Sequence, residues 1–438
     1  MSDVKFVPGL ATSLISVGKL VQKNLSVCFG KEDCKIVDSK GDTVVTGARD
    51  GGLYRLRAAG AAMKATESRH RENCQHQWHR RLGHRESPAI ERILKEILAN
   101  GIKASTADPC LYVRGGDCKV YLLVYVDDLL VASSSEGEIL KIFNSLNVDL
   151  DLTSLVSVRH FLGLEVKREQ GVFKICLQQY IEKLVSNHGM SDAKGVRSPM
   201  DPGYLKCVET GEVLEDATQY RSLVGGLLYL AVVARPDIAN TAAVLGRKCC
   251  GPTQCDWTAA KRVLRYLKRT STYFLVAGGN PGQRLNGYSD GDWAGEPDNR
   301  ESTSGSVFFF GGSAISWASR KQASVTLSSM EAEYVALSEA CQEAIWLRKL
   351  LSDLGEAQTE PTVIREDNQG YLAFVKSERV SRKSKHIDTR QKFVQELCVK
   401  KVIDLVYCPS DCMIADVMTK PLGPTKHTKF CEDLGLQQ

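Results

Sequence analysis

The last part of the chain has the pattern that most restricts how this sequence can fold. Residues 285 to about 435 read as strand, strand, strand, helix, strand, helix, strand, helix. A glycine-rich loop, GGNPG at 278–282, precedes this pattern and predicts a domain boundary. Strand ends and the helix starts that adjoin them can converge at one edge of a sheet, where side chains form a site. We therefore expect an α/β domain over 285–438.

Length and composition are those of a globular chain with several domains. The 438 residues allow roughly two to four domains of ~100–200 residues each. Hydrophobic residues make up 43% and charged residues 25%, which argues against global disorder. The apolar uncharged run 222–234 is far shorter than the ~20 apolar residues of a membrane span. The first residues contain no apolar core of a signal peptide, so we expect an intracellular protein with no membrane partner.

Basic residues are concentrated in two segments. The segment 376–392 has seven basic residues and two acids, a balance of +5 that equals the net charge of the whole chain. A second basic cluster lies at 261–269. Either cluster alone fits a solvated helix surface. Because the two flank a set of carboxylates, together they favour a phosphate backbone as the partner.

Four acidic residues of the last domain are placed as a metal site requires. Mg²⁺ binds carboxylate oxygens and keeps water molecules that substrate phosphates can replace. Two such ions about 3.5–4 Å apart can activate a water and stabilise the leaving oxygen of a phosphodiester. A single acid is more often a surface carboxylate, so the set of four carries the hypothesis. The four lie in the strand 285–292, the helix from about 328, the strand 363–367 and the helix after the strand 402–408: Asp290, Glu333, Asp367 and Asp416.

The sequence around these acids resembles one known family. The segments are YSDGDWAG at 288–295, RESTSG at 300–305, ISWASRKQ at 315–322, SSMEAEY at 328–334, EDNQ at 366–369, SKHID at 384–388 and ADVMTK at 415–420. They closely resemble the ribonuclease H domain of copia-type LTR retrotransposon Pol polyproteins, almost continuously from 287 to 422. The resemblance implies the ribonuclease H fold, a mixed five-stranded sheet with helices. It also implies cleavage of the RNA strand of RNA–DNA hybrids with Mg²⁺, or with Mn²⁺ in its place, and it gives the catalytic and metal-binding roles to the same four acids.

Two of the four acids have a competitor nearby. Glu331 competes with Glu333, but two helical positions differ by ~200°, and Glu333 shares its face with apolar positions that look inward. Asp388 competes with Asp416. Asp388 lies in the basic segment ahead of the predicted helix 390–399, whereas Asp416 follows the last strand, as the fold requires. We therefore favour Glu333 and Asp416.

The resemblance also implies a nucleic-acid partner. Hybrid recognition relies on shape, phosphates and 2′-hydroxyls rather than on base sequence. The residues that we expect to contact the substrate backbone are Lys383, Lys385, His386 and Arg390. The family further implies the full-length Pol product or virus-like particle components as partners, and a cytoplasmic location, a nuclear location or both.

The middle of the chain resembles part of a second enzyme. Its segments are DPCLYV at 108–113, YVDD at 125–128, FLGLEV at 161–166, YRSLVGGLLYL at 220–230, RPDI at 235–238 and AAKRVLRYLK at 259–268. They look like the C-terminal half of a copia-type reverse transcriptase, from the late palm through the thumb and connection. Asp127 and Asp128 lie at an apolar hairpin tip, where paired acids are costly without cations. Such a polymerase also needs an Asp from an earlier palm strand, and no segment before 108 supplies it. We therefore expect a remnant metal pair and no polymerase activity from this chain alone.

The N-terminal part resembles a pre-integrase module without a complete zinc site. Residues 1 to about 60 alternate short apolar stretches with turns, which predicts a small β module. VPGLATSLISV at 7–17 and QWHRRLGH at 77–84 resemble the pre-integrase region of the same polyproteins. That family completes His79 and His84 with a downstream Cys-x-x-Cys, and the fifteen cysteines of this chain include no such pair. Two histidines cannot close a tetrahedral site, so we expect no zinc.

These segments predict three domains and leave three interpretations of the whole chain. The domains are a pre-integrase remnant at 1–103, a partial reverse transcriptase at 104–280 and a ribonuclease H domain at 285–438, joined as in an internally deleted element. The first interpretation is a truncated Pol product with a competent ribonuclease H. The second is a module that binds nucleic acid without turnover. The third is a decayed relic. The complete set of four acids favours the first over the second, whereas the incomplete palm favours the third.

Overall fold

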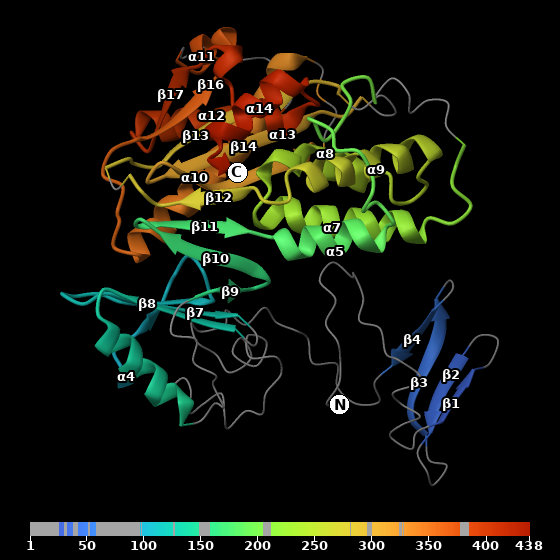
Figure 1. Ribbon diagram of the computed structural model, residues 1–438, viewed down its shortest axis with the longest axis horizontal. Coiled ribbons are helices and arrows are strands. Elements are labelled where there is room, and N and C mark those ends of the chain that lie inside the picture. The colour runs from blue at the N-terminus through green and yellow to red at the C-terminus, as the bar shows by residue number, and fades with distance from the viewer. Residues whose placement is uncertain are drawn as a thin grey trace. The chain divides into compact units, whose positions relative to one another are not determined.

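The structure of the chain is a computed structural model, drawn as a ribbon in Figure 1. It describes residues 26–29, 33–37, 43–50, 53–57, 97, 99–125, 128–148, 158–204, 212–280, 282–295, 300–323, 326, 328–376 and 385–438. The chain divides into two units, 1–72 and 73–438. Within the described ranges, every helix is too short or too polar to cross a membrane.

The first unit contains the small β module that the sequence predicts. Its four strands pair in sequence order as an antiparallel sheet. They are β1 (Ser26–Phe29), β2 (Asp33–Val37), β3 (Thr43–Asp50) and β4 (Leu53–Arg57). The segments 7–17 and 77–84, with His79 and His84, lie outside the described residues.

The second unit begins with a four-stranded antiparallel sheet and one helix. Buried and partly exposed residues alternate along β7, and Val120, Leu122 and Val124 enter its core. The predicted hairpin at 121–132 is formed by β7 and β8, which pair from Val120 to Ser133. The elements are β5 (Lys103–Ala104), β6 (Leu111–Arg114), β7 (Val120–Tyr125), β8 (Asp128–Ser133) and α4 (Glu136–Asn147).

A second sheet and a group of helices follow, and the end of the chain completes the sheet. The strand order is β18-β12-β11-β10-β9, so the last strand of the chain pairs with β12. The strands are β9 (His160–Phe161), β10 (Leu164–Glu169), β11 (Val172–Cys176), β12 (Phe274–Ala277) and β18 (Leu436–Gln437). The helices are α5 (Gln178–Asn187), α7 (Thr218–Val233), the 3₁₀ turn η2 (Pro236–Ile238), α8 (Ala239–Arg247) and α9 (Gln254–Arg269).

The C-terminal region has the mixed five-stranded sheet that the family resemblance implies. The strand order is β15-β14-β13-β16-β17; β13, β14 and β15 are antiparallel, whereas β16 and β17 run parallel to β13. The strands are β13 (Asn286–Asp292), β14 (Thr303–Phe310), β15 (Ser313–Lys321), β16 (Thr362–Glu366) and β17 (Ile403–Tyr407). The helices are α10 (Ser329–Asp353), α11 (Gln369–Lys376), α12 (Lys385–Val399), the 3₁₀ turn η3 (Ser410–Cys412), α13 (Asp416–Thr419) and α14 (Pro424–Asp433). The expected α/β class and ribonuclease H sheet are thus confirmed.

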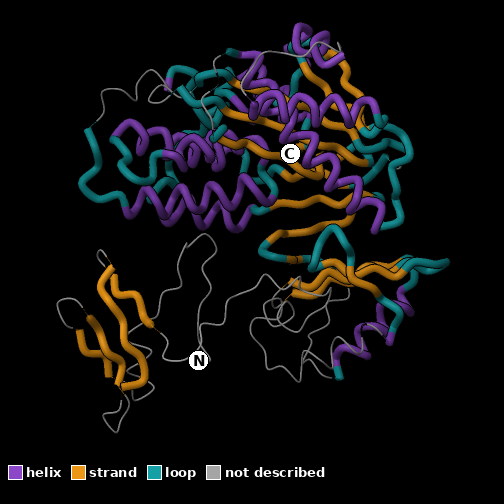
Figure 2. Tube along the Cα trace, turned by 180° about the vertical axis from the view of Figure 1, so that it is seen from behind, coloured by secondary structure: helices purple, strands orange, loops and turns teal. Residues whose placement is uncertain are grey.

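Both faces of this sheet are covered, by different parts of the chain. Side chains of successive strand residues point to opposite faces, so Phe308 packs in the core under α10 while Val307 and Phe309 pack in the core of the upstream helices. Across the second face, Trp317 Nε1 donates a hydrogen bond to Ala231 O at 2.7 Å. Figure 2 shows the helical group beside the strands of the sheet. The predicted boundary at 281–284 stays a prediction, but the packing of hydrophobic side chains is continuous across it.

Candidate metal centre

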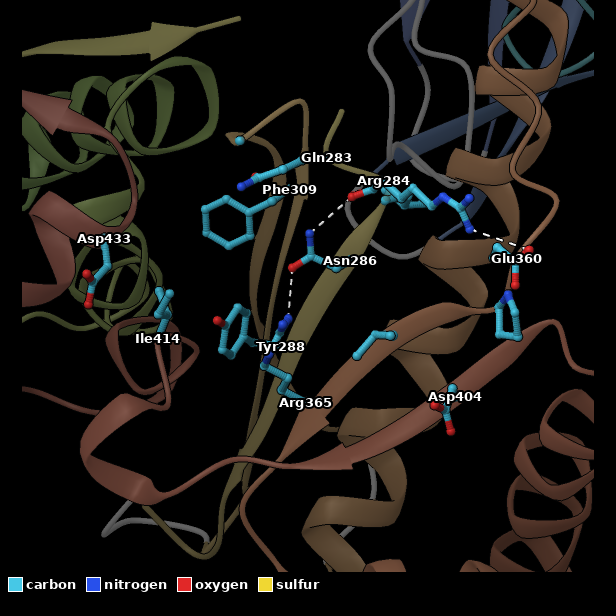
Figure 3. Close-up of a pocket in the computed structure, with 14 residues that line it drawn as sticks. Gln283, Arg284, Asn286, Tyr288, Phe309, Glu360, Arg365, Asp404, Ile414 and Asp433 are labelled. Carbon is cyan, nitrogen blue, oxygen red and sulfur yellow. Dashed lines mark hydrogen bonds and ion pairs between the residues drawn. The ribbon is translucent and has the colours of Figure 1, made fainter. Parts of the chain in front are cut away.

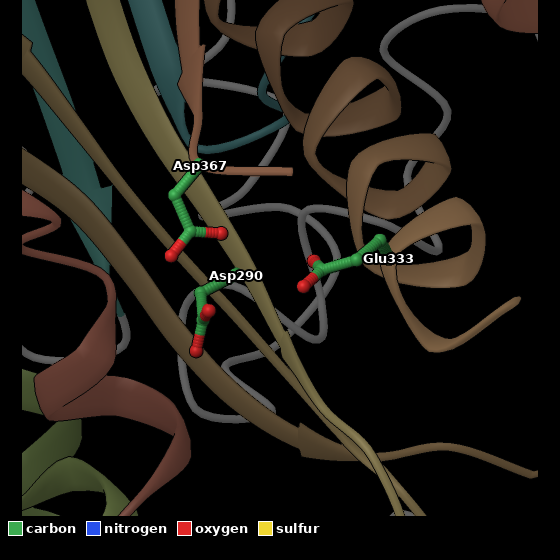
Figure 4. Close-up of side chains that lie close together, drawn as sticks. All are labelled: Asp290, Glu333 and Asp367. Atoms are coloured by element: carbon green, nitrogen blue, oxygen red, sulfur yellow. The ribbon is translucent and has the colours of Figure 1, made fainter. Parts of the chain in front are cut away.

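Three of the four predicted acids meet at one edge of the five-stranded sheet. Asp290 lies on β13, Asp367 follows the last residue of β16, and Glu333 lies in the first turns of α10. One carboxylate oxygen from each lies within 4.8 Å of the other two. Figure 4 shows the three side chains pointing toward one another. Parallel β13 and β16 end at the same edge of the sheet, which explains why Asp290 and Asp367 are neighbours.

Two glycines allow the helices to approach the strand that carries Asp290. A Cβ on Gly291 would lie 2.7 Å from Ala332 C and 2.9 Å from Glu333 N, so α10 could not pack this closely against any other residue. A Cβ on Gly305, which pairs with Asp290 across the β13–β14 ladder, would lie 2.5 Å from Thr419 Cγ2. The first contact brings Glu333 to Asp290. The close approach at Gly305 brings α13 to Asp290 from the opposite face of the sheet.

Burial gives this site an unusual electrostatic state. Asp290 and Glu333 are only 2% and 6% exposed. Burial raises the pKa of Asp290 to about 6, against the opposing effect of Lys420. Burial, reinforced by the charges of Glu366 and Asp290, raises the pKa of Glu333 well above its usual range. The folded chain therefore disfavours the ionised forms of these carboxyls unless a cation is present.

Asp416 is connected to the three acids through a lysine. Lys420 Nζ lies 2.8 Å from Asp416 Oδ1 and 3.5 Å from Asp290 Oδ2. Burial alone would lower the pKa of Lys420, but Asp290 and Asp416 outweigh burial and raise it. Lys426 Nζ also contacts Asp416, at 2.6 Å, and Thr419 Oγ1 donates a hydrogen bond to Asp290 Oδ2. Asp416 is thus part of the same electrostatic group, although it lies outside the three-carboxylate cluster.

Glu366 is a fifth carboxyl at this place, and the sequence pattern alone did not predict it as a site residue. It is 0% exposed, and on β16 it points to the same buried face as Ile364. Its Oε1 accepts a hydrogen bond from Asn368 N at 3.3 Å. Burial raises its pKa well above the usual range, and the charge of Asp290 adds to this effect. The adjacent Asp367, at the strand end, fits the expected pattern of a site residue, whereas Glu366 has the position of a core residue of the strand.

The two predicted alternatives are placed differently by the fold. Glu333, rather than Glu331, belongs to the carboxylate cluster. Glu331 lies in the first turn of α10, where its backbone N–H donates a hydrogen bond to Oγ of the cap residue Ser328. Asp388 lies within α12, which begins at Lys385, five residues before the predicted helix 390–399. Its side chain is outside the described residues. Asp416 opens α13 after β17, as predicted.

Of the remaining predicted site residues, the structure describes the side chains of Asp128 and Arg390. Asp128 is exposed and accepts a hydrogen bond from Leu162 N at 3.1 Å, while Asp127 lies outside the described residues. Arg390 Nη1 lies 3.8 Å from Glu339 Oε1 on α10, so it joins α12 to α10. Lys383 lies outside the described residues, as do the side chains of Lys385 and His386 on α12. These assignments stay predictions.

A separate hollow of about 770 Å³ lies farther along the same strand and includes none of the four acids. In Figure 3, Arg365 contacts Asn286, with Nη1 2.8 Å from Oδ1. The Arg365 guanidinium also lies over the ring of Tyr288, 4.9 Å from its centroid. The hollow has both cationic and acidic walls, including Asp404 and Asp433. The hollow is therefore distinct from the place where the carboxylates converge.

The donor set fits a hard divalent cation. All three converging groups are carboxylates, and oxygen ligands are what Mg²⁺ and Mn²⁺ prefer. In the described part of the chain, buried Glu333 Oε2 and Glu366 Oε2 accept no hydrogen bond from an amide, hydroxyl or basic group, and the two carboxyls are neighbours. Such groups are costly to bury without a partner. Asp290, Glu333 and Asp367 are therefore the residues that could hold a metal ion.

Several known proteins are similar to this chain in sequence. Residues 81–202 match the reverse transcriptase (RNA-dependent DNA polymerase) family. The retrovirus-related Pol polyprotein from transposon TNT 1-94 of Nicotiana tabacum is 35% identical over 339 residues, 75% of this chain and 25% of that protein. The "Putative transposon Ty5-1 protein YCL074W" of Saccharomyces cerevisiae is 32% identical over 257 residues, 58% of this chain and 82% of that protein. The chain belongs to the copia-type retrotransposon Pol family. The resemblance stated from its motifs is thereby confirmed.

This Pol-family chain spans about a quarter of the length of the Pol polyprotein from transposon TNT 1-94. It is a retrotransposon Pol-derived protein with a reverse transcriptase region, from a family of nucleic-acid-processing enzymes. The reverse transcriptase match begins at 81, upstream of the predicted boundary at 103, which stays a prediction. Among solved structures, LC11-RNase H1, isolated from compost, is 16% identical, covers 31% of this chain and 92% of its own, and has a TM-score of 0.25.

Proposed function

We propose that this Pol-family chain hydrolyses the RNA strand of RNA–DNA hybrids at the carboxylates of its ribonuclease H domain. The observation that carries the proposal is the convergence of Asp290, Glu333 and Asp367 within 4.8 Å at one sheet edge. The raised pKa values of Asp290 and Glu333 support it, because perturbed carboxyls gather at functional sites. We further propose Asp416 as the fourth member of the group.

In this proposal, some residues of the chain bind the metal ion and others orient its ligands. Asp290, Glu333 and Asp367 supply the oxygen ligands of a divalent ion. A bound Mg²⁺ or Mn²⁺ ion would supply Lewis acidity and a nucleophilic water at neutral pH. Thr419 donates to Asp290, and Ser410 Oγ donates to Asp367 Oδ2 at 2.8 Å, so both carboxylates have fixed orientations.

Charge around the cluster is balanced only in part by the protein. Lys420 bridges Asp290 and Asp416, and Lys426 contacts Asp416. Among the described residues, Lys420 is a cation that lowers the pKa of Glu333, but burial and the charges of Glu366 and Asp290 outweigh it. The carboxylates therefore outnumber the cations. A site with this excess negative charge favours a divalent ion and opposes a bare phosphate, so metal binding would precede substrate binding.

The proposal is tested with the full chain and a labelled RNA–DNA hybrid. We expect Mg²⁺-dependent cleavage that falls by at least about 100-fold in Asp290→Asn, since even outer partners of metal ligands are worth about 10–100-fold. The matched control is Asp404→Asn, an exposed acid of the same sheet on β17, and it should cleave normally. Circular dichroism verifies that each variant is folded. A folded chain that binds the hybrid without cutting it would overturn catalysis and leave a binding module.

A second pair of variants tests the choice between the two helix acids. Glu333→Gln should lose cleavage as Asp290→Asn does, because its carboxylate is in the cluster. Glu331→Gln should retain it. The reverse result would show that the other face of α10 carries the ligand.

A further inference from the structure

The helical group upstream of the ribonuclease H sheet contacts the helix that carries Asp416. Asn240, the second residue of α8, is 3% exposed, and its Nδ2 donates a hydrogen bond to Met418 O at 3.3 Å. The two residues are 178 positions apart in the sequence. Met418 directly precedes Thr419, whose hydroxyl donates to Asp290. Asn240, which lies outside the predicted ribonuclease H domain, is thus connected to Asp290 through two hydrogen bonds and the adjacent residues Met418 and Thr419.

The helix α13 needs such a contact because it cannot hold its own position. It has only four residues, and the first turn of a helix is unfavourable on its own. The last carbonyls of any helix also lack partners within it. Asn240 supplies a donor to one of these carbonyls. The place of α13 is set by its neighbours, which are β13, β14, β15, α8 and η2.

The turn η2, which directly precedes α8 and Asn240, contains a buried ion pair. Arg235 Nε and Nη2 lie 2.9 and 2.7 Å from the two carboxylate oxygens of Asp237, and both residues are buried. Tyr266 Oη donates to the same carboxylate at 2.6 Å. Asp237 O lies 3.0 Å from Nε2 of His427 on α14, the helix that follows α13. The turn η2 is therefore bonded to α14 through His427, and α8, which follows η2, is bonded to α13 through Asn240.

We propose that Asn240 is a positioning residue of the metal centre. By holding Met418 O it fixes α13, and through α13 the places of Asp416 and of Thr419, which orients Asp290. The motif RPDI at 235–238, singled out in the sequence as part of the reverse transcriptase region, then serves the ribonuclease H site. This inference rests on the proposed function, since it assigns a role at the centre proposed there.

The test measures binding of Mn²⁺ alone to the full chain, by calorimetry and without nucleic acid. Asn240→Leu removes the donor and keeps the shape of the side chain. We expect its affinity for Mn²⁺ to fall about tenfold, the lower end for outer partners of metal ligands. The matched control is Tyr220→Phe. Tyr220 is equally buried, and its Oη donates to Leu245 O at 2.7 Å, at the far end of α8 from Asn240. Its loss should leave Mn²⁺ affinity within about twofold of the wild type.

Urea unfolding of both variants separates position from stability. The two variants each lose one buried hydrogen bond to a helix carbonyl, so similar losses of stability are expected. A change of Mn²⁺ affinity in Asn240→Leu but not in Tyr220→Phe supports the positioning role. Equal affinities in all three proteins, or equal losses in both variants, overturn it. A wild-type chain that takes up no Mn²⁺ overturns the proposed function instead.

Discussion

At the scale of single residues, burial of the Asp290 carboxyl lowers the stability of the folded chain at neutral pH, a cost that the proposed metal ion would offset. Burial raises its pKa to about 6, compared with about 3.9 in an unfolded chain. The folded state therefore binds the proton more tightly, and its stability falls as the pH rises from about 4 through 6. Two pKa units correspond to about 3 kcal/mol. We predict that Asp290→Asn raises the free energy of unfolding by about this amount near pH 7.5 in EDTA, measured by urea unfolding.

The same substitution should have little effect near pH 4, because there the Asp290 carboxyl is protonated in the folded state. Asp404→Asn provides the comparison, since its side chain is exposed on β17 and should change stability by less than about 0.5 kcal/mol. Adding Mg²⁺ should reverse the order of stabilities at the higher pH, because the ion binds only the wild-type cluster tightly. An equal gain at both pH values would refute the electrostatic explanation.

At the scale of elements, the centre depends on how closely α10 approaches β13. A methyl group on Gly291 would meet backbone atoms of Ala332 and Glu333 at 2.7–2.9 Å, and backbone cannot move aside as a side chain can. We predict that Gly291→Ala lowers the free energy of unfolding by about 1–3 kcal/mol, as overpacking does. It should also weaken Mn²⁺ binding, because Glu333 is pushed away from Asp290. Calorimetry and urea unfolding measure the two effects.

Gly282→Ala is the matched control for this prediction, since a Cβ there would meet nothing within 4 Å. If Gly291→Ala were as stable as this control, α10 would not be held against β13 as described. The comparison also tests whether metal affinity follows local geometry, because only Gly291 adjoins a ligand.

The elements around the centre were largely predictable, and their contacts were less so. The strand predicted at 285–292 is β13 (Asn286–Asp292), and the helix expected from about 328 is α10, because period and capping residues are local signals. Glu366 was missed because a strand alternation says which face a residue points to but not what lies there. Lys420 was missed as a bridge, although it stands one helical turn after Asp416. Contacts such as Asn240 with Met418 join distant segments and leave no local signal.

At the scale of the whole molecule, the ribonuclease H sheet and the upstream helices form one packing unit. Val307, Phe309 and Phe430 share a core with α5, α7, α8 and α9, and β18 pairs with β12. A fragment limited to 285–438 would expose these side chains and lose the partner of its last strand. Each large apolar side chain returned to water costs about 1.5–3 kcal/mol, which soon exceeds the stability of a domain.

We therefore predict different behaviour for two fragments cut on either side of the helical group. The fragment 158–438 should unfold in one cooperative urea transition and bind Mn²⁺ as the full chain does, because it retains the shared core and the contact of Asn240. The fragment 285–438 should bind a hydrophobic dye and show no cooperative transition. Should 285–438 fold cooperatively and bind Mn²⁺ with full affinity, the upstream helices would be neighbours of the centre rather than part of what builds it.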